Sequence, residues 1–437
     1  MNFIENIFKI KENNTTVKTE ILAGITTFFT MSYLYVLSPK ILENAGLEFG
    51  STLTVTALIA FIGSILMAFI ANKPYAVAPF LGETAFVAYT MVAALGFSIK
   101  TVLASISVCG VLLLIMTLTN IRGYILEQIP DNIKQSFCIG LGLFFIFIAL
   151  RDIGIVNFTA NSIPIEAGNF TSLPVLLGVF CFVLLIVLVK KKMNAAVIAA
   201  ISITTILGMV LGDIELPSKI ISFPSGISSS ILQVDYTGIL DKEFIPMLYI
   251  IFLLVNIDTS GAIVGLSYKS DVDCRNNRTG LKKTMIADSL SVIIAPLLGT
   301  TTPGAYLDSM TGISAGGRTG LTSLTVGVLF IAGLIFTPLI MIIPPYAYAP
   351  ALLYVGILMT SVITKIDFND ITEYAPAIMT ICIMIFTYNI GIGIISGFII
   401  YPLIKLFSAQ RKDINITTWI MFFLSVLFFA IKQFSVF

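Results

Sequence analysis

Long apolar segments constrain this chain more than any other feature. Four of them, ILAGITTFFTMSYLYVL, VLLLIMTLT, SLPVLLGVFCFVLLIVLV and SLTVGVLFIAGLIFTPLIMII, lack the polar face that a surface helix of a soluble protein carries. Segments near 20 residues match the roughly 30 Å hydrocarbon core of a bilayer. Charged residues make up 11% of the chain, against about 25% in an ordinary soluble domain. The sequence therefore predicts a polytopic membrane protein.

The apolar segments predict an all-α membrane fold with 14 transmembrane segments in two inverted seven-span repeats. The expected spans are 20–38, 51–71, 76–95, 98–119, 132–150, 172–190, 194–212, 244–267, 283–299, 303–317, 320–343, 349–364, 373–388 and 391–407. We expect a first seven-span repeat over 1–212, an extracellular connecting loop over 213–243 and a second repeat over 244–408. A C-terminal apolar segment lies in 409–437, and the sequence leaves open whether 417–436 crosses the membrane.

The loops between these spans indicate an orientation. With the N-terminus in the cytoplasm, 19 of the 25 Lys and Arg residues fall in cytoplasmic loops, Arg122 among them, and five fall outside. Basic residues concentrate on the cytoplasmic side of membrane proteins. We therefore expect a multi-pass protein of the plasma membrane with a cytoplasmic N-terminus.

Several functions are excluded by what the sequence lacks. The net charge of +1 and the absence of a basic soluble domain exclude a nucleic-acid partner. GISAG at 312–316 matches the serine-hydrolase elbow, but the chain has no histidine to act as the base of a catalytic triad. Without a Walker loop or a metal-ligand motif, we expect no enzyme, no cofactor and no metal. The five widely spaced cysteines predict free thiols.

The third expected span is interrupted. Residues 72–91, NKPYAVAPFLGETAFVAYTM, place Pro74 and Pro79 inside an apolar stretch. The two prolines predict extended backbone over 75–80, followed by a half-helix that begins near Gly82.

The tenth span, GTTTPGAYLDSMTGISAGG at 299–317, is interrupted in the same way. Aligning Pro79 with Pro303 places Thr84 opposite Asp308. Paired broken spans in two halves of a chain indicate the midplane site of a transporter. We expect the two extended pieces to pair with each other, because exposed backbone groups are not tolerated in lipid.

Three carboxyl groups, those of Glu83, Asp258 and Asp308, lie inside apolar spans. Such groups are expensive in a bilayer and usually mark a substrate or ion path. Each also has a plainer interpretation, as an acid at a helix N-terminus for Glu83 and Asp308 and as an interhelical hydrogen bond for Asp258. Because the chain has no histidine, proton coupling near neutral pH needs an acid, and we assign this role to Asp308.

Other side chains complete the predicted site. Thr84 and Asn256 offer hydrogen bonds, and Phe86 and Tyr306 offer aromatic faces beside the broken backbone. In the plainer interpretation Thr84 bonds its own helix and the aromatic rings only pack. The predicted substrate-binding residues are Asp258, Asp308, Thr84, Glu83, Phe86, Tyr306 and Asn256, and Phe28, Phe29 and Tyr33 are weaker candidates for stacking.

The chain resembles the nucleobase–cation symporters of the xanthine/uracil/ascorbate permease superfamily, most closely the AzgA-like hypoxanthine/guanine/adenine permease branch. The resemblance rests on TEILAGITTFFTMSYLYVLSP (19–39), GETAF (82–86), IDTSGAIVG (257–265) and above all SMTGISAGGRTGLTS (309–323). It covers essentially the whole chain. It implies fourteen spans in two inverted repeats, a core domain that carries the substrate, a gate domain that supports it, and proton-coupled uptake of a purine base.

This sequence departs from the pattern of the resembled family at three places. Thr84 stands where an Asn is usual, Val255 replaces the first of two Asp residues on the eighth span, and Asp308 is shorter than the usual Glu. These departures leave the preferred base open.

Three hypotheses of function follow. The first is a purine-base symporter with H+ as the coupling ion, Na+ not being excluded, that works alone or as a homodimer. The second is an anion carrier of the related sulfate-type architecture, against which the three acids argue. The third is a non-transporting receptor or an intramembrane enzyme.

Overall fold

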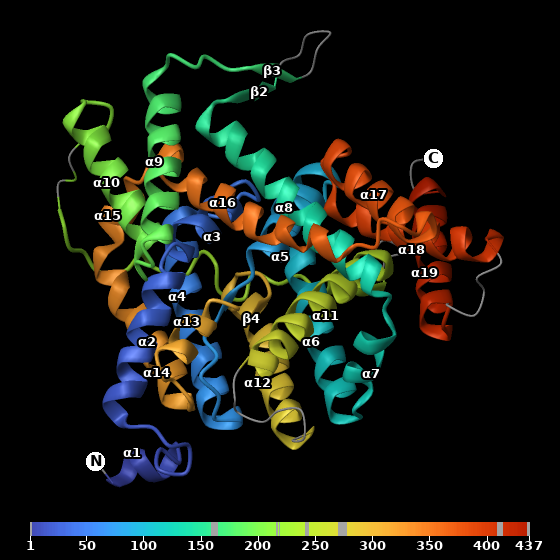
Figure 1. Ribbon diagram of the computed structural model, residues 1–437, viewed down its shortest axis with the longest axis horizontal. Helices are drawn as coiled ribbons and strands as arrows, with labels where there is room; N and C mark the ends of the chain where they lie inside the picture. The colour runs from blue at the N-terminus through green and yellow to red at the C-terminus, as the bar shows by residue number, and fades with distance from the viewer. Residues whose placement is uncertain are drawn as a thin grey trace.

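The computed structural model describes residues 2–158, 165–215, 217, 219–240, 244–269, 278–408 and 414–434, and the chain is mostly helical (Figure 1). Within the described residues, nine helices are long and apolar enough to cross a membrane. Shorter apolar helices cover Leu81–Ala94, Ala196–Val210, Ile371–Phe386 and Ile416–Ala430. The protein is therefore a multi-pass membrane protein, while the count of fourteen spans and the inverted relation of two halves stay predictions.

The helices follow one another with few long loops. The first part of the chain contains α1 (Asn2–Ile7), α2 (Val17–Met31), α3 (Leu34–Glu43), α4 (Phe49–Leu66), α5 (Leu81–Ala85), α6 (Ile99–Leu118), α7 (Ile121–Gln128), α8 (Asp131–Ile153), α9 (Leu173–Lys190) and α10 (Ala196–Val210). The second contains α11 (Phe244–Lys269), α12 (Arg278–Leu298), α13 (Ser309–Ser314), α14 (Gly320–Gly333), α15 (Thr337–Met341), α16 (Pro345–Thr360), α17 (Ile371–Phe386), α18 (Ile390–Phe407) and α19 (Ile416–Phe434).

Contacts between the helices divide them into two groups. In the first group α4, α6, α12 and α14 pack on one another, with α2, α3, α5, α11 and α13 around them. In the second group α8 packs on α16 and α17, and α9, α10, α18 and α19 join these. Figure 1 draws α12 and α14 in the lower half of the molecule and α8, α9 and α17 in the upper half. Each group takes helices from both parts of the chain.

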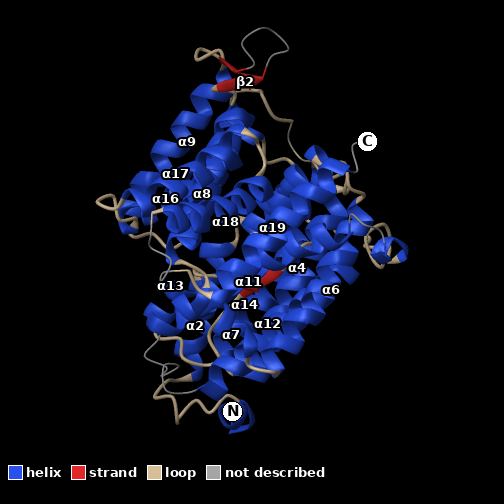
Figure 2. Ribbon diagram, turned by 90° about the vertical axis from the view of Figure 1, so that its right-hand side faces the viewer, coloured by secondary structure: helices blue, strands red, loops and turns tan. Residues whose placement is uncertain are grey.

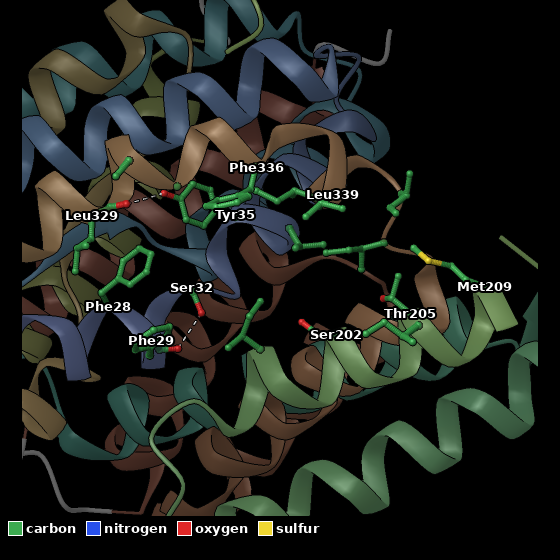
Figure 3. Close-up of a pocket in the computed structure, with 18 residues that line it drawn as sticks. Phe28, Phe29, Ser32, Tyr35, Ser202, Thr205, Met209, Leu329, Phe336 and Leu339 are labelled. Atoms are coloured by element: carbon green, nitrogen blue, oxygen red, sulfur yellow. Dashed lines mark hydrogen bonds between the residues drawn. The ribbon is translucent and has the colours of Figure 1, made fainter. Parts of the chain in front are cut away.

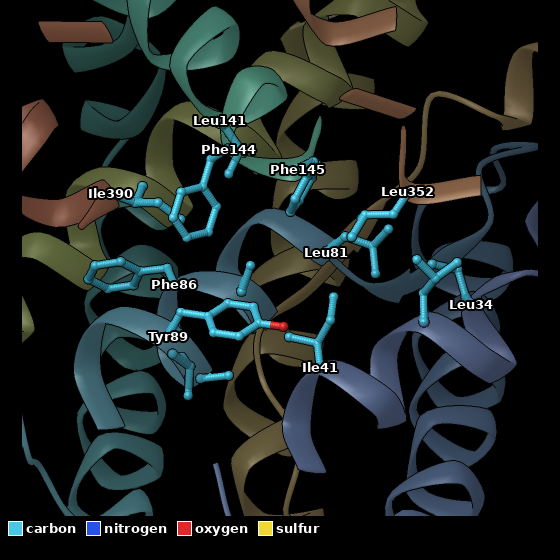
Figure 4. Close-up of a cluster of buried hydrophobic side chains, with 14 of the residues drawn as sticks. Leu34, Ile41, Leu81, Phe86, Tyr89, Leu141, Phe144, Phe145, Leu352 and Ile390 are labelled. Carbon is cyan, nitrogen blue, oxygen red and sulfur yellow. The ribbon is translucent and has the colours of Figure 1, made fainter. Parts of the chain in front are cut away.

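Buried apolar side chains fill the boundary between the groups (Figure 4). Leu34, Leu81 and Phe86 come from the first group, and Phe144 and Ile390 from the second. Because lipid is as apolar as this cluster, close packing rather than exclusion of water favours the contact. Such a boundary is compatible with relative movement of the two groups.

The structure differs from the expected elements in three places. The expected span 20–38 is divided between α2 and α3, and the Ser32 hydroxyl donates to the Phe29 carbonyl at the break. A hairpin of β2 (Val156–Phe158) and β3 (Ile165–Ala167) was not expected, and neither was the short helix α7. Short elements of this kind carry too few residues to show a period in the sequence.

The motif SMTGISAGGRTGLTS joins α13 to α14 and is held by a buried acid of α2. The Glu20 carboxylate accepts hydrogen bonds from the backbone N–H groups of Arg318 and Thr319 and from the Thr322 hydroxyl, at 2.8, 3.1 and 2.6 Å. The Arg318 guanidinium donates to the Ile313 carbonyl at 2.6 Å. Glu20 thus fixes the segment that leads into α14, and Arg318 satisfies a carbonyl at the C-terminus of α13.

Candidate functional site

Two short strands pair where the two broken spans meet. β1 (Val77–Pro79) runs antiparallel to β4 (Pro303–Ala305), and Pro79 lies opposite Pro303. All six of these residues are buried, and Figure 2 shows the sheet among the helices of the first group. Pairing satisfies the backbone of both strands, as a buried extended segment requires. The expected pairing of the two extended pieces is confirmed.

A half-helix follows each strand. α5 begins at Leu81, close to the expected start at Gly82, and continues as the π-helical segment η2 (Phe86–Ala94). A second π-helical segment, η1 (Met67–Ala71), precedes β1. α13 follows β4 after a turn that contains Asp308. π-helical turns are rare and occur often at functional sites. The two that flank β1 therefore favour the broken third span as part of the functional site.

Tyr306 joins the two broken spans. Its hydroxyl donates to the Pro79 carbonyl at 2.6 Å and accepts from the Leu81 N–H at 3.2 Å. Its ring stacks on Phe80, with ring centroids 5.1 Å apart and an angle of 23°. A side chain at Gly304 would clash with the Phe80 ring, so the stack needs a glycine there. Phe80 was not among the expected site residues.

The three acids lie within electrostatic range of this tyrosine. Tyr306 interacts electrostatically with Asp308, Glu83 and Asp258. An added Cβ on Gly82 would lie 3.1 Å from Asp258 Oδ2, so Asp258 of α11 lies directly against α5. Asp258 is partly buried, and we find no hydrogen bond from its carboxyl group to any other described residue. Its oxygens are therefore available to a ligand.

Asp308 lies next to Tyr33, at the junction of α2 and α3. Its carboxyl oxygen Oδ2 is 3.5 Å from the Tyr33 hydroxyl, at the outer limit of a hydrogen bond, and it makes no capping bond to α13. It is partly buried, and Tyr354 of α16 in the second group interacts with it electrostatically. Asp308 is therefore within electrostatic range of both helix groups.

Two other expected site residues, Thr84 and Phe86, are occupied by contacts within the protein in this conformation. The Thr84 hydroxyl pairs with the Thr301 hydroxyl at 2.7 Å and donates to the Phe80 carbonyl at 2.7 Å. Phe86 is buried in the apolar cluster, where a side chain on Gly391 of α18 would meet its ring at 2.8 Å. Neither presents a free surface to a ligand here, and their roles in binding stay predictions.

Asn256 lies on the opposite face of α11 from Asp258, because two residues apart on an α-helix are about 200° apart. Its Oδ1 accepts from the Ser260 hydroxyl at 3.2 Å. Ser260 in turn accepts from Arg122 Nε at 3.0 Å. Asn256 therefore joins the network of Arg122 and faces away from Asp258, and its role in binding stays a prediction.

A buried ion pair is the main feature that sequence reasoning missed. Arg122 of α7, expected in a cytoplasmic loop, is completely buried and donates to Asp288 of α12 at 2.6 Å. The same guanidinium donates to the hydroxyls of Thr259, Ser260 and Ser289, so it ties α7 to α11 and α12. Asp288 carried a usable signal, since it is one more acid inside an apolar span. Nothing in the sequence pointed to its partner, 166 positions away.

A large groove lies elsewhere. It encloses about 630 Å³ between α2, α3, α10 and the α14–α15 region. Figure 3 shows Phe28, Phe29, Tyr35, Phe336 and Met209 along its walls. None of the three acids around Tyr306 lines it. Phe28 and Phe29, weaker candidates for stacking on a substrate, belong to this apolar groove instead.

Comparison with known proteins decides the family. A family model described as a permease family, that of the xanthine/uracil permeases, matches residues 18–396. This chain belongs to the xanthine/uracil permease family. As a member of that family it is a permease and not an enzyme.

Relatives in the xanthine/uracil permease family match over nearly the whole chain. The adenine permease AdeQ of Escherichia coli is 36% identical over 415 residues, which cover 94% of this chain and 93% of the relative. The guanine/hypoxanthine permease PbuO of Bacillus subtilis is 33% identical over 430 residues, covering 96% and 99%. The transmembrane domain of the cyanobacterial bicarbonate transporter BicA has a similar fold, with a TM-score of 0.65 at 14% identity over 87% of this chain and 97% of that one.

Proposed function

We propose that this permease is a secondary active transporter that imports a purine nucleobase by proton symport with alternating access. The observation that carries the proposal is the match, over nearly the full length, to permeases for adenine and for guanine and hypoxanthine. The three acids around Tyr306 add a site of suitable chemistry.

A purine base is planar and nearly uncharged, with N–H donors and ring acceptors along its edge. Asp258, which is partly exposed and has no partner among the described residues, is suited to accept N–H bonds from it. The Phe80 ring, which is partly exposed and stacks on the buried Tyr306, supplies an aromatic surface next to the strands. A base that does not match would leave the buried polar groups unpaired, and this disfavours its binding.

The second candidate is an anion carrier, since BicA and a murine anion transporter of the SLC26 family share the fold. At 14% and 12% identity these likenesses concern the fold alone. Three acids gather at Tyr306, and the guanidinium of Arg122 is occupied by Asp288 and hydroxyl groups. An anion would meet repulsion there rather than a free cation.

Uptake of labelled substrates tests the proposal. Cells that express the chain should accumulate at least one of adenine, hypoxanthine and guanine, and a protonophore should abolish the accumulation. Uracil and sulfate serve as competitors of different class. Concentrative uptake of sulfate without any purine uptake would contradict the proposal and favour the anion carrier.

Replacing Asp258 by Asn should weaken binding of the base. Losing a charged acceptor typically costs about 1.5–3 kcal/mol, which raises Kd by roughly one to two orders of magnitude. Equilibrium binding to purified protein measures this, with Glu43→Gln as the control because Glu43 is an exposed carboxylate of α3. An unchanged Kd for Asp258→Asn would remove Asp258 from the base-binding site.

A further inference from the structure

Glu83 differs from the other two acids in its burial. Its side chain lies in a residue only 3% exposed, and neither carboxyl oxygen has a hydrogen-bond partner among the described residues. Asp258 and Asp308 are partly exposed. A ligand that reaches those two acids therefore does not touch Glu83 in this conformation.

The groups around Glu83 offer no positive charge to balance it. Asp258 of α11 lies against the neighbouring Gly82, and Asp288 of α12, Cys109 of α6 and Tyr306 interact with Glu83 electrostatically. Arg122 is the cation of this region in the described part of the chain, and it is bound to Asp288. Arg122 therefore neutralises Asp288, and Glu83 and Asp258 have no counter-ion among the described residues.

An ionised carboxylate is strongly disfavoured when it is buried without a counter-ion or a hydrogen-bond donor. The neutral acid avoids most of that penalty, since it carries no charge. Burial and the absence of partners thus indicate that Glu83 holds a proton in the conformation described here.

We propose that Glu83 is a second proton-binding group of this carrier, filled in this conformation and emptied when the two helix groups move apart, so that two protons accompany each base. The inference rests on the proposed function, proton symport. It assigns Glu83 to the proton rather than to direct contact with the base.

The packing of α5 against α8 indicates how the Glu83 proton is released to water. Gly82 is covered by Leu141 of α8, where an added Cβ would meet the leucine side chain at 2.6 Å. α8 belongs to the second helix group and α5 to the first, so relative movement of the groups uncovers this part of α5. Asp258 is partly exposed and interacts electrostatically with Glu83, so it is suited to take up the proton. When the groups have moved apart and the base has left, the O–H bond of Glu83 breaks as one forms on the Asp258 carboxylate, which then passes the proton to water; return to the conformation described here restores the proton on Glu83.

The limiting ratio of internal to external base, measured in proteoliposomes, tests the inference. With the membrane potential held at zero and a gradient of one pH unit, each coupled proton contributes a factor of about ten to the ratio of internal to external base. We expect a limiting ratio of about 100 for the wild type and about 10 for Glu83→Gln, which cannot release a proton. Glu83→Asp keeps the acid and should stay near the wild-type ratio, and Glu43→Gln should leave it unchanged.

The other outcomes are distinct. A wild-type ratio of about 10, or a ratio of about 100 for Glu83→Gln, overturns the role of Glu83 and leaves proton symport standing. A wild-type ratio of about one overturns both proposals. If Glu83→Gln is inactive, infrared difference spectra provide the second measurement. The base-free wild type should show the C=O stretch of a protonated carboxyl group that Glu83→Gln lacks, and an identical band in both proteins overturns the inference.

Discussion

Replacing Asp308 by Asn should lower the accumulation limit of a purine base by about 100-fold across a gradient of two pH units. Asn keeps the size of the side chain but cannot release a proton, and each proton removed from the cycle lowers the limit about tenfold per pH unit. Asp308 is suited to the coupling role because it is partly exposed, is within electrostatic range of both helix groups, and has only the distant Tyr33 hydroxyl as a partner among the described residues.

The measurement is the limiting ratio of internal to external base in proteoliposomes, with exchange of labelled base as the control for a folded carrier. Asp308→Glu keeps a titratable acid and should retain coupling. Asp308→Asn combined with Glu83→Gln should reach a ratio of about one. Accumulation by Asp308→Asn equal to that of the wild type would end the assignment of Asp308 as a coupling acid.

Replacing Arg122 by Gln should destabilise the protein by about 3–5 kcal/mol, because it leaves Asp288 as a buried charge without its counter-ion. The side chains of both residues are completely buried, and Arg122 donates further to Thr259 and Ser260, the two residues that follow Asp258 on α11. Unfolding in mixed micelles with increasing denaturing detergent measures the change in the free energy of unfolding.

Two further variants separate the ion pair from general damage. Asp288→Asn combined with Arg122→Gln removes both charges and should be less destabilised than the sum of the single variants, since neither group is left charged and unpaired. Lys283→Gln, at an exposed position of α12, should have little effect. If the double variant loses as much free energy of unfolding as the two single variants together, the two charges do not stabilise each other.

Much of the site's backbone could be predicted from proline positions. Pro74 and Pro79 prevent a continuous helix in the third span, and Pro303 does the same in the tenth. Buried extended backbone needs a partner, and each broken span is the natural partner of the other. The observed register, with Pro79 opposite Pro303, agrees with the alignment that the sequence alone suggested.

The side chains of the site were harder to predict. Asn256 and Asp258 are near neighbours in the sequence, yet helix geometry separates them, so that Asn256 joins the network of Arg122. Tyr306 was expected to offer a free aromatic face, while in the structure its hydroxyl bridges Pro79 and Leu81 and its ring stacks on Phe80.

The sequence by itself determined that the chain is a membrane protein with two broken spans, because bilayer thickness and proline geometry act locally along the chain. Only the tertiary structure decided which of the acids is buried and which is partly exposed. In the sequence, Glu83 and Asp258 both lie inside apolar spans, and no local pattern distinguishes their burial. They differ because Glu83 is enclosed on every side by packed helices, whereas Asp258 keeps part of its surface exposed. Burial and ion pairing depend on segments more than a hundred residues apart, and no local pattern encodes them.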